Sequence, residues 1–158
     1  MENNRIISNP ILVGAMELLK TDDTEEHRDL VMKEIMSATF LAPVVIVPAP
    51  VADENGNLHM QPDSRINFCM LKTPDEKALF MAFTDWDELR KWKNEKDQQT
   101  LALKLEDYSR MLHQKNAQGD ETPAIGFAIN PYGANIVVTR EGVAHILAAK
   151  ESAKKMGS

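Results

Sequence analysis

The spacing of apolar residues changes at Pro43, and this change constrains the fold more than any other feature of the chain. Before it, apolar residues recur at helical spacing in two segments. The first, residues 9–20, begins with an Asn-Pro pair, which is typical of a helix N-terminus. The second follows the polar residues 21–24 and carries its apolar stripe to Phe40, and Pro43 then forbids a longer helix. We therefore expect a helical hairpin at the N-terminus.

After Pro43 the apolar runs are short and rich in β-branched residues, which favours strands, beginning with 44–47. Residues 49–63 have weak strand character around a strong Asn-Gly turn signal, so we expect an exposed excursion. Runs 65–72 and 77–83 are expected to pair as an antiparallel hairpin. The other predicted elements are a helix at 84–92 capped by Thr84 or Asp85, a strand at 100–105, a helix at 106–115, strands at 124–129 and 135–138, and a final helix that Thr139 caps and that reaches Ala149 or beyond.

These elements predict a single α+β domain over residues 1–158. Its sheet would be mixed, largely antiparallel and flanked by helices, with the helical hairpin at the N-terminus. A chain of this length can bury roughly 70% of its unfolded surface, so it needs no disulfide or structural metal. We expect residues 1–8 and 151–158 to be frayed.

The charge distribution argues against nucleic acid as a partner. The net charge is −6, and the most basic cluster, residues 90–96, is interleaved with acidic residues. A nucleic-acid site would present a basic patch or stripe instead. No apolar run approaches the roughly 18 residues of a membrane span, and the N-terminus lacks the profile of a signal peptide. We expect a cytoplasmic protein without a membrane partner.

Residues that could carry catalysis or bind a metal are scattered along the chain. The histidines His27, His59, His113 and His145 form no two-histidine helical motif. Cys69, the one cysteine, lies in an apolar run where a small buried side chain is expected. No Gly-x-Ser-x-Gly elbow or complete phosphate loop is present. We therefore expect no catalytic residues, no metal and no cofactor.

The Asn-Pro-Tyr-Gly stretch at residues 130–133 separates two apolar runs and can be interpreted in two ways. As a turn, it combines the fixed φ of proline with the permissive backbone of glycine, and Gly133 would take a positive φ. As a ligand loop, it would present Asn130 and Tyr132 at the edge of the sheet. We expect the turn, and we regard Asn130 and Tyr132 as candidate binding residues.

Trp86 and Trp92 are the other candidate binding residues. They are six positions apart, so they project about 240° from each other on a helix and at most one can point squarely into the core. The outer one is available for a protein contact, because tryptophan is enriched at binding hot spots. We expect a partner to bind through the 53–63 excursion together with this outward tryptophan.

Three segments together resemble the N-terminal domain of the SseB (enhanced serine sensitivity protein B) family: NPILVGAMELL at 9–19, FTDWDELRKW at 83–92 and GFAINPYGANIVVTREGVAHIL at 126–147. The resemblance implies an α+β domain with a mixed sheet flanked by helices, found in bacterial cytoplasmic proteins. It implies no known catalytic residue. Longer family members carry a further C-terminal domain, which we do not expect within 158 residues.

Three classes of function stay open at this point. A non-catalytic protein-interaction or regulatory module, with an unidentified protein partner, is favoured by the missing catalytic motifs and by the tryptophans. A small-molecule sensor, for example for an amino acid, is the alternative, and an enzyme is the third possibility. Nothing in the sequence sets the oligomeric state.

Overall fold

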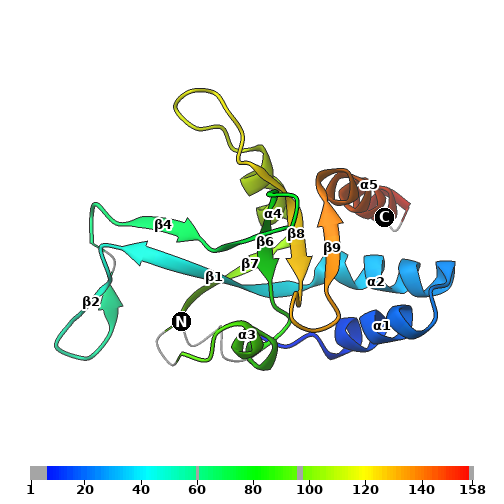
Figure 1. Ribbon diagram of the computed structural model, residues 1–158, viewed down its shortest axis with the longest axis horizontal. Helices are drawn as coiled ribbons and strands as arrows, with labels where there is room; N and C mark the ends of the chain where they lie inside the picture. The colour runs from blue at the N-terminus through cyan, green and yellow to red at the C-terminus, as the bar shows by residue number, and fades with distance from the viewer. Residues whose placement is uncertain (1–6, 60, 96–97, 157–158) are drawn as a thin grey trace.

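Two β-sheets meet at the centre of the molecule, and helices pack around them (Figure 1). The computed structural model describes residues 7–59, 61–95 and 98–156. In chain order, its elements are α1 (Pro10–Thr21), α2 (Glu25–Ser37), β1 (Thr39–Val47), β2 (Val51–Ala52), β3 (Leu58–His59), β4 (Arg65–Phe68), β5 (Met70–Lys72), β6 (Ala78–Ala82), α3 (Trp86–Trp92), β7 (Gln99–Lys104), α4 (Leu105–His113), β8 (Ala124–Ile129), β9 (Ile136–Thr139) and α5 (Arg140–Met156).

The strands form two main sheets and one small hairpin. The first sheet has the order β4-β1-β7, the second has the order β5-β6-β8-β9, and β2 pairs with β3. Only β6 and β8 are parallel among these pairs of the described chain, and the others are antiparallel. An antiparallel bridge between Leu41 and Phe83 joins the two main sheets. The predicted α+β class, with mixed strands and an N-terminal helix pair, is confirmed.

Strand alternation divides the core into two clusters. Phe40 of β1 belongs to the main cluster, which α1, α2, α4 and α5 cover, whereas its neighbour Leu41 belongs to a second cluster beneath α3. Tyr108 of α4 is 0% exposed in the main cluster and stacks on Phe127 with ring centroids 4.5 Å apart. Its hydroxyl donates to the carbonyl of Met81 at 2.8 Å. This bond ties α4 to the central strand β6.

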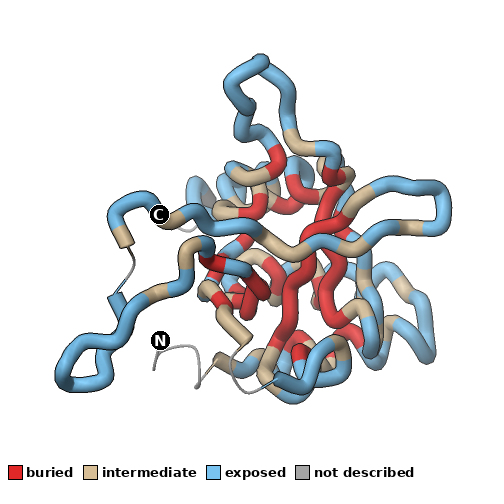
Figure 2. The backbone as a smooth tube through the Cα atoms, turned by 60° about the vertical axis from the view of Figure 1, so that its left-hand side comes forward, coloured by how far each residue is buried: buried red, intermediate tan, exposed pale blue. Residues whose placement is uncertain are grey.

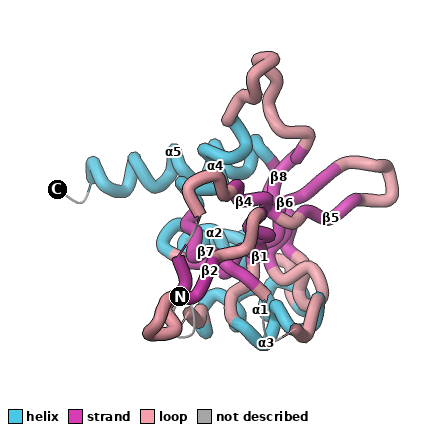
Figure 3. The backbone as a smooth tube through the Cα atoms, turned by 90° about the vertical axis from the view of Figure 1, so that its left-hand side faces the viewer, coloured by secondary structure: helices cyan, strands magenta, loops and turns pink. Residues whose placement is uncertain are grey.

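The outer half of β1, together with β4, extends away from the helices as an arm (Figure 1). We define the arm as the described residues of 44–68. The predicted excursion lies at its tip, where Gly56 takes a φ of +82° beside the β2–β3 hairpin. Figure 2 shows that burial is concentrated in the central strands and that the tip of the arm is exposed. Figure 3 shows α1 and α3 together at one end of the molecule, opposite the 114–123 loop.

The predicted hairpin of 65–72 with 77–83 forms only in part. Residues 70–72, strand β5, pair with β6, but β4 pairs with β1 instead. The division falls at Cys69, whose N–H donates to the carbonyl of Pro43 at 3.1 Å. Because Pro43 has no N–H to return this bond, the ladder between β1 and the 65–72 run is interrupted there. One apolar run therefore contributes strands to both sheets.

The second helix ends earlier than predicted. α2 stops at Ser37, and β1 already begins at Thr39 and runs through Pro43 to Val47. Phe40, which we expected at the end of the helical stripe, belongs to the strand and is 0% exposed. Over so short an apolar run, helical and strand periodicity coincide, so the boundary is misplaced.

The final helix is capped as predicted, because Thr139 Oγ1 accepts a hydrogen bond from the N–H of Gly142 at 3.1 Å. The helix continues to Met156, so the prediction of a frayed end from residue 151 begins too early. Lys150 explains part of the extension, since it donates to the carbonyl of Met36 and pairs with Glu106 at 3.2 Å. Of the other residues expected to fray, 1–6 and 157–158 lie outside the described chain, and Ile7 packs against the second cluster. Within the described ranges, no helix combines the length and apolarity that crossing a membrane requires.

Candidate functional site at the ends of two parallel strands

β6 and β8 are parallel, so the segments that follow them leave the sheet at the same edge. After β6 the chain passes through Phe83 and Thr84 into α3, and after β8 it enters the 130–133 stretch. The start of α1 lies against the same edge. The three sequence segments singled out above therefore meet at one place in the fold.

Asn130 connects the two strand ends. Its backbone N–H donates to the carbonyl of Ala82 at 2.9 Å. Its side-chain Oδ1 accepts from the N–H of Thr84 at 3.0 Å, and its Nδ2 donates to Thr84 Oγ1 at 2.9 Å. The residue is 2% exposed and has a φ of +50°, a conformation that asparagine adopts more readily than most residues. This candidate binding residue is therefore buried, and its hydrogen bonds hold the two strand ends of the site together.

Asn9 fixes the start of α1 to the same strand end. Its Nδ2 donates to the carbonyls of Thr39 and Thr84, both at 2.9 Å. Pro10 occupies the first turn of α1 as predicted, but the side chain of Asn9 does not cap the helix. The amide instead holds together three segments that are far apart in the sequence.

Asp85 caps α3. This decides between Thr84 and Asp85, the two caps that the sequence leaves open. Its Oδ1 accepts from the N–H of Glu88 at 2.9 Å. Its Oδ2 accepts from the hydroxyl of Thr84 at 2.8 Å. Thr84 therefore links the capping carboxylate to Asn130, and the orientation of α3 is coupled to the end of β8.

The 130–133 stretch forms the predicted turn, in which the carbonyl of Asn130 accepts from the N–H groups of Gly133 at 2.8 Å and Asn135 at 2.9 Å. The prediction that Gly133 takes a positive φ is wrong, because the positive φ angles of this turn belong to Asn130 and Asn135. Gly133 is needed for space instead. A Cβ atom there would lie 2.2 Å from Glu88 Oε1, so the absence of a side chain lets this carboxylate lie against the turn.

Glu88 and Lys91 form an ion pair on the face of α3 that contacts the turn. The side chain of Glu88 is 15% exposed, whereas that of Lys91 is 50% exposed. The hydrogen bond with Glu88 raises the pKa of Lys91, and the negative charge of Glu17 on α1 acts in the same direction. Carboxylates from two helices thus act on one ammonium group.

A cavity of about 440 Å³ lies between α1, α3 and the turn. Its volume falls in the range of small-molecule sites. Two Glu-x-x-Lys pairs face it, Glu17 and Lys20 from α1 and Glu88 and Lys91 from α3. Its remaining lining residues are Val13, Met16, Thr21, Asn130, Gly133 and Ala134. The cavity is therefore a largely apolar hollow with balanced charges at its walls.

Trp86 and Trp92 lie on the other face of α3, and both are half-buried against the second cluster. This differs from the expected inward and outward pair. On the helix the two indoles stand on either side of Leu89, which is 0% exposed, so both reach the same cluster. Trp92 stacks on Phe83 with centroids 6.3 Å apart. Tyr132, the remaining candidate, is 50% exposed in the turn.

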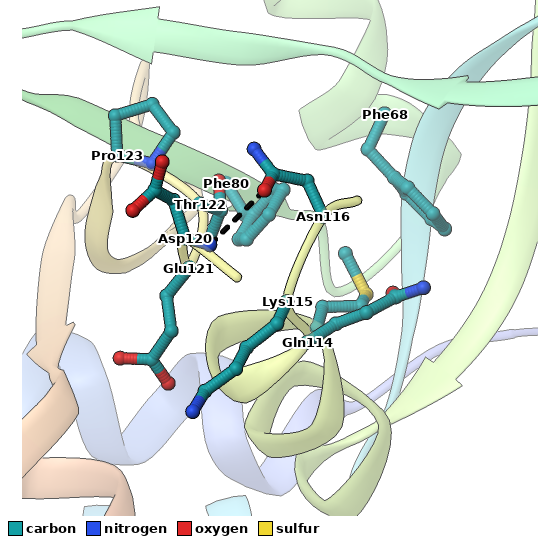
Figure 4. A pocket seen from close by; sticks show the side chains of 10 residues that line it. Phe68, Phe80, Gln114, Lys115, Asn116, Asp120, Glu121, Thr122 and Pro123 are labelled. Atoms are coloured by element: carbon teal, nitrogen blue, oxygen red, sulfur yellow. Dashed lines mark hydrogen bonds between the residues drawn. The ribbon is translucent and has the colours of Figure 1, made fainter. Parts of the chain in front are cut away.

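A second cavity, of about 290 Å³, lies beneath the 114–123 loop (Figure 4). Figure 4 shows Phe80 behind the loop and Phe68 to its side. The loop is folded on itself, because Asn116 Oδ1 accepts from the N–H groups of Gln118 and Asp120 at 2.9 and 3.0 Å. Glu121 Oε2 lies 3.0 Å from Nδ1 of His113, the last residue of α4. Hydrogen bonds within the loop therefore shape the rim of this cavity.

No group of three or more metal-ligating side chains gathers anywhere in the described ranges. The thiol of Cys69 is half-buried, and burial raises its pKa, which lowers the fraction of reactive thiolate at neutral pH. The positive charge of Lys93 only partly opposes this effect. The environment of Cys69 therefore resembles that of a packed side chain.

Sequence reasoning missed Asn9, Thr84 and the charged residues of the first cavity. A signal was present, because both helices carry the pattern Glu-Leu-x-Lys, at 17–20 and at 88–91. The second copy overlaps the mixed-charge cluster that we interpret only as evidence against a nucleic-acid site. Its convergence with the first depends on the long-range hydrogen bonds from Asn9 to Thr39 and Thr84, which local patterns do not reveal.

Together, the fold and the site define an α+β domain whose parallel strand pair ends in a buried asparagine–threonine junction beside a charged cavity. Residues 12–145 match the family model of the SseB protein N-terminal domain, so the chain belongs to this family. Comparisons with curated proteins and with solved structures give no match.

Proposed function

We propose that the protein is a non-catalytic interaction module that binds a protein partner through the arm. The observation that carries the proposal is the distribution of exposed apolar side chains. Of the ten large ones exposed in the described chain, five lie on the arm: Val45, Val47, Val51, Leu58 and Ile66. A concentration of this kind on a projecting element is typical of a binding surface.

The charge of the arm favours a basic partner over a second copy of the chain. The sequence from 51 to 66 holds three carboxylates, Asp53, Glu54 and Asp63, against one guanidinium, Arg65. Two such arms would repel each other, whereas a surface with an apolar centre and a basic rim would be attracted. The net charge of −6 acts in the same direction.

The outer edge of the arm offers a second mode of contact. β4 is the outer strand of its sheet, and Arg65, Ile66 and Asn67 are exposed along it. An extended partner segment can add main-chain hydrogen bonds to such an edge. The tryptophan that we expected to share this surface does not do so. Trp86 and Trp92 are both half-buried against the second cluster, and α3 is well separated from the β2–β3 hairpin along the long axis (Figure 1).

Site-specific photo-crosslinking in cells that make the protein tests the proposal. A benzophenone amino acid is placed at Val47 or Leu58 on the arm, and at Ala144 or Ala148 on the exposed face of α5 as matched controls. We expect one discrete adduct from the arm positions and none from α5. Absence of arm adducts, equal adducts from α5, or an adduct of twice the chain's mass would contradict the proposal.

The cellular location is also part of the proposal. We place the module in the cytoplasm of a bacterium because the family resemblance implies that location. The serine sensitivity in the family's name is compatible with a regulatory partner but specifies no molecular activity.

A further inference from the structure

The cavity between α1, α3 and the 130–133 turn differs from the other cavities in its charged groups. Two carboxylates and two ammonium groups face it, one of each from α1 and from α3. Balanced charges of both signs, rather than a cluster of one sign, line the walls. Recognition of a ligand here would therefore depend on two opposite charges held a short distance apart.

The charged groups of α1 are available for a ligand. In the described chain, Glu17 and Lys20 make no side-chain hydrogen bond and no ion pair within 4.0 Å. On the facing wall, the Glu88–Lys91 pair lies against Gly133, whose missing side chain leaves room for the carboxylate. The cavity thus has one pair of opposite charges that bond to each other, Glu88 and Lys91, and one pair that do not, Glu17 and Lys20.

The floor of the cavity is apolar and firmly packed. Met16 is 0% exposed, and Val13 and Ala134 are partly buried beside it. Asn130 borders the floor, but its side chain is bonded to Thr84, so it shapes the cavity rather than competing for a ligand. An aliphatic group could bury its surface on this floor.

We propose that this cavity binds a small zwitterion of the amino-acid class. The ligand's ammonium group lies between the carboxylates of Glu17 and Glu88, and its carboxylate lies between Lys20 and Lys91. Val13 and Ala134 contact its aliphatic part, and Met16 lies buried beneath them. A phosphorylated or polycationic ligand is disfavoured, because two of the four wall charges would repel it. The proposal is independent of the arm, so either can fail alone.

A bound zwitterion would also link α1 to α3. The two helices contribute opposite walls of the cavity, and their relative position is already coupled to the Asn9, Thr84 and Asn130 hydrogen bonds. A ligand that binds only the folded state stabilises it by mass action. Binding should therefore raise the melting temperature of the full chain.

The test is a titration of the full chain with each of the twenty L-amino acids, followed by calorimetry and by backbone amide NMR shifts. For the best ligand, its decarboxylated amine and its deaminated acid are titrated as well. We expect at least one amino acid to bind with a Kd of about 1 mM or tighter, with shifts at α1, α3 and the 130–135 turn. Each analogue that lacks one charge should bind at least about tenfold more weakly.

Glu17→Gln and Lys20→Gln should each weaken binding about tenfold while leaving the fold intact, because both side chains are exposed. The matched controls are Glu151→Gln and Lys154→Gln, which alter an exposed Glu-x-x-Lys pair on α5. The proposal is overturned if no amino acid binds, if the singly charged analogues bind equally well, or if the α5 variants weaken binding as much as the α1 variants.

Discussion

At the strand ends Thr84 and Asn130 are 0% and 2% exposed and share two hydrogen bonds, whereas on the arm Val47 and Leu58 are 53% and 56% exposed. The first region is held by buried polar bonds between segments that are far apart in sequence. The second exposes apolar surface that stabilises the fold little. The comparison teaches that the family-like segments position the scaffold, while the least packed strands carry the surface that we propose for binding.

The largest effect should come from adding one methyl group where strands approach closely. A Cβ at Gly126 of β8 would lie 2.1 Å from the carbonyl oxygen of Val138, a backbone atom that cannot rotate away. Gly126→Ala should therefore lower the free energy of unfolding by about 3 kcal/mol. Gly133→Ala meets only the movable end of Glu88 and should cost less than about 1 kcal/mol. Urea denaturation of both variants measures the difference, and equal losses would contradict this account of the two glycines.

The junction can be broken by Asn130→Ala, with Asn135→Ala as its matched control. Both asparagines have φ near +50°, but only Asn130 is buried and bonded to Thr84. Asn130→Ala leaves the N–H of Thr84 without its acceptor and should cost about 3 kcal/mol, against about 1 kcal/mol for Asn135→Ala. Thermal or urea unfolding gives both values. If the two variants lose the same free energy of unfolding, backbone strain explains both losses and the buried hydrogen bonds of Asn130 contribute nothing.

Tyr108 gives a pH-dependent contrast between core and surface. Burial raises the pKa of Tyr108, with a smaller contribution from the charge of Asp107, so the folded state favours the neutral phenol. Its stabilising effect is therefore fully present below about pH 10, the usual tyrosine pKa, and is lost as the pH rises above that value. Tyr108→Phe should remove this part of the alkaline loss and should cost about 1 kcal/mol at pH 7, because the carbonyl of Met81 loses its donor.

The control for this titration is Tyr132→Phe, because Tyr132 is 50% exposed in the turn. Unfolding free energies measured between pH 7 and pH 11 should fall as steeply in Tyr132→Phe as in the unaltered protein. An unchanged slope in Tyr108→Phe would show that other groups cause the loss.

Local patterns predicted most of the elements and the fold class, because helical spacing, proline positions and β-branched runs act over short stretches. They failed where the outcome depends on a distant partner. The break at Cys69 requires knowing that Pro43 lies opposite, and the reason for Gly133 requires knowing that Glu88 packs on it.

The candidate site was only partly predictable for the same reason. Asn130 and Tyr132 were singled out from a turn motif, yet Asn130 bonds to Thr84, which is 46 positions earlier in the chain. The Glu-x-x-Lys pairs are ordinary surface patterns when read separately. Only long-range contacts bring their two helices to one cavity, because Asn9 at the start of α1 bonds to Thr84, which lies just before α3.

The central claim is that the exposed apolar side chains of the arm bind a partner without stabilising the scaffold. Crosslinking from Leu58 in a Val45→Ser/Val47→Ser variant tests this claim most directly. Both valines are about half exposed on β1. The free energy of unfolding of the variant should therefore lie within about 1 kcal/mol of that of the unaltered protein. The account predicts that the Leu58 adduct falls at least about tenfold while the protein stays folded. An adduct of unchanged yield from the folded variant would contradict it.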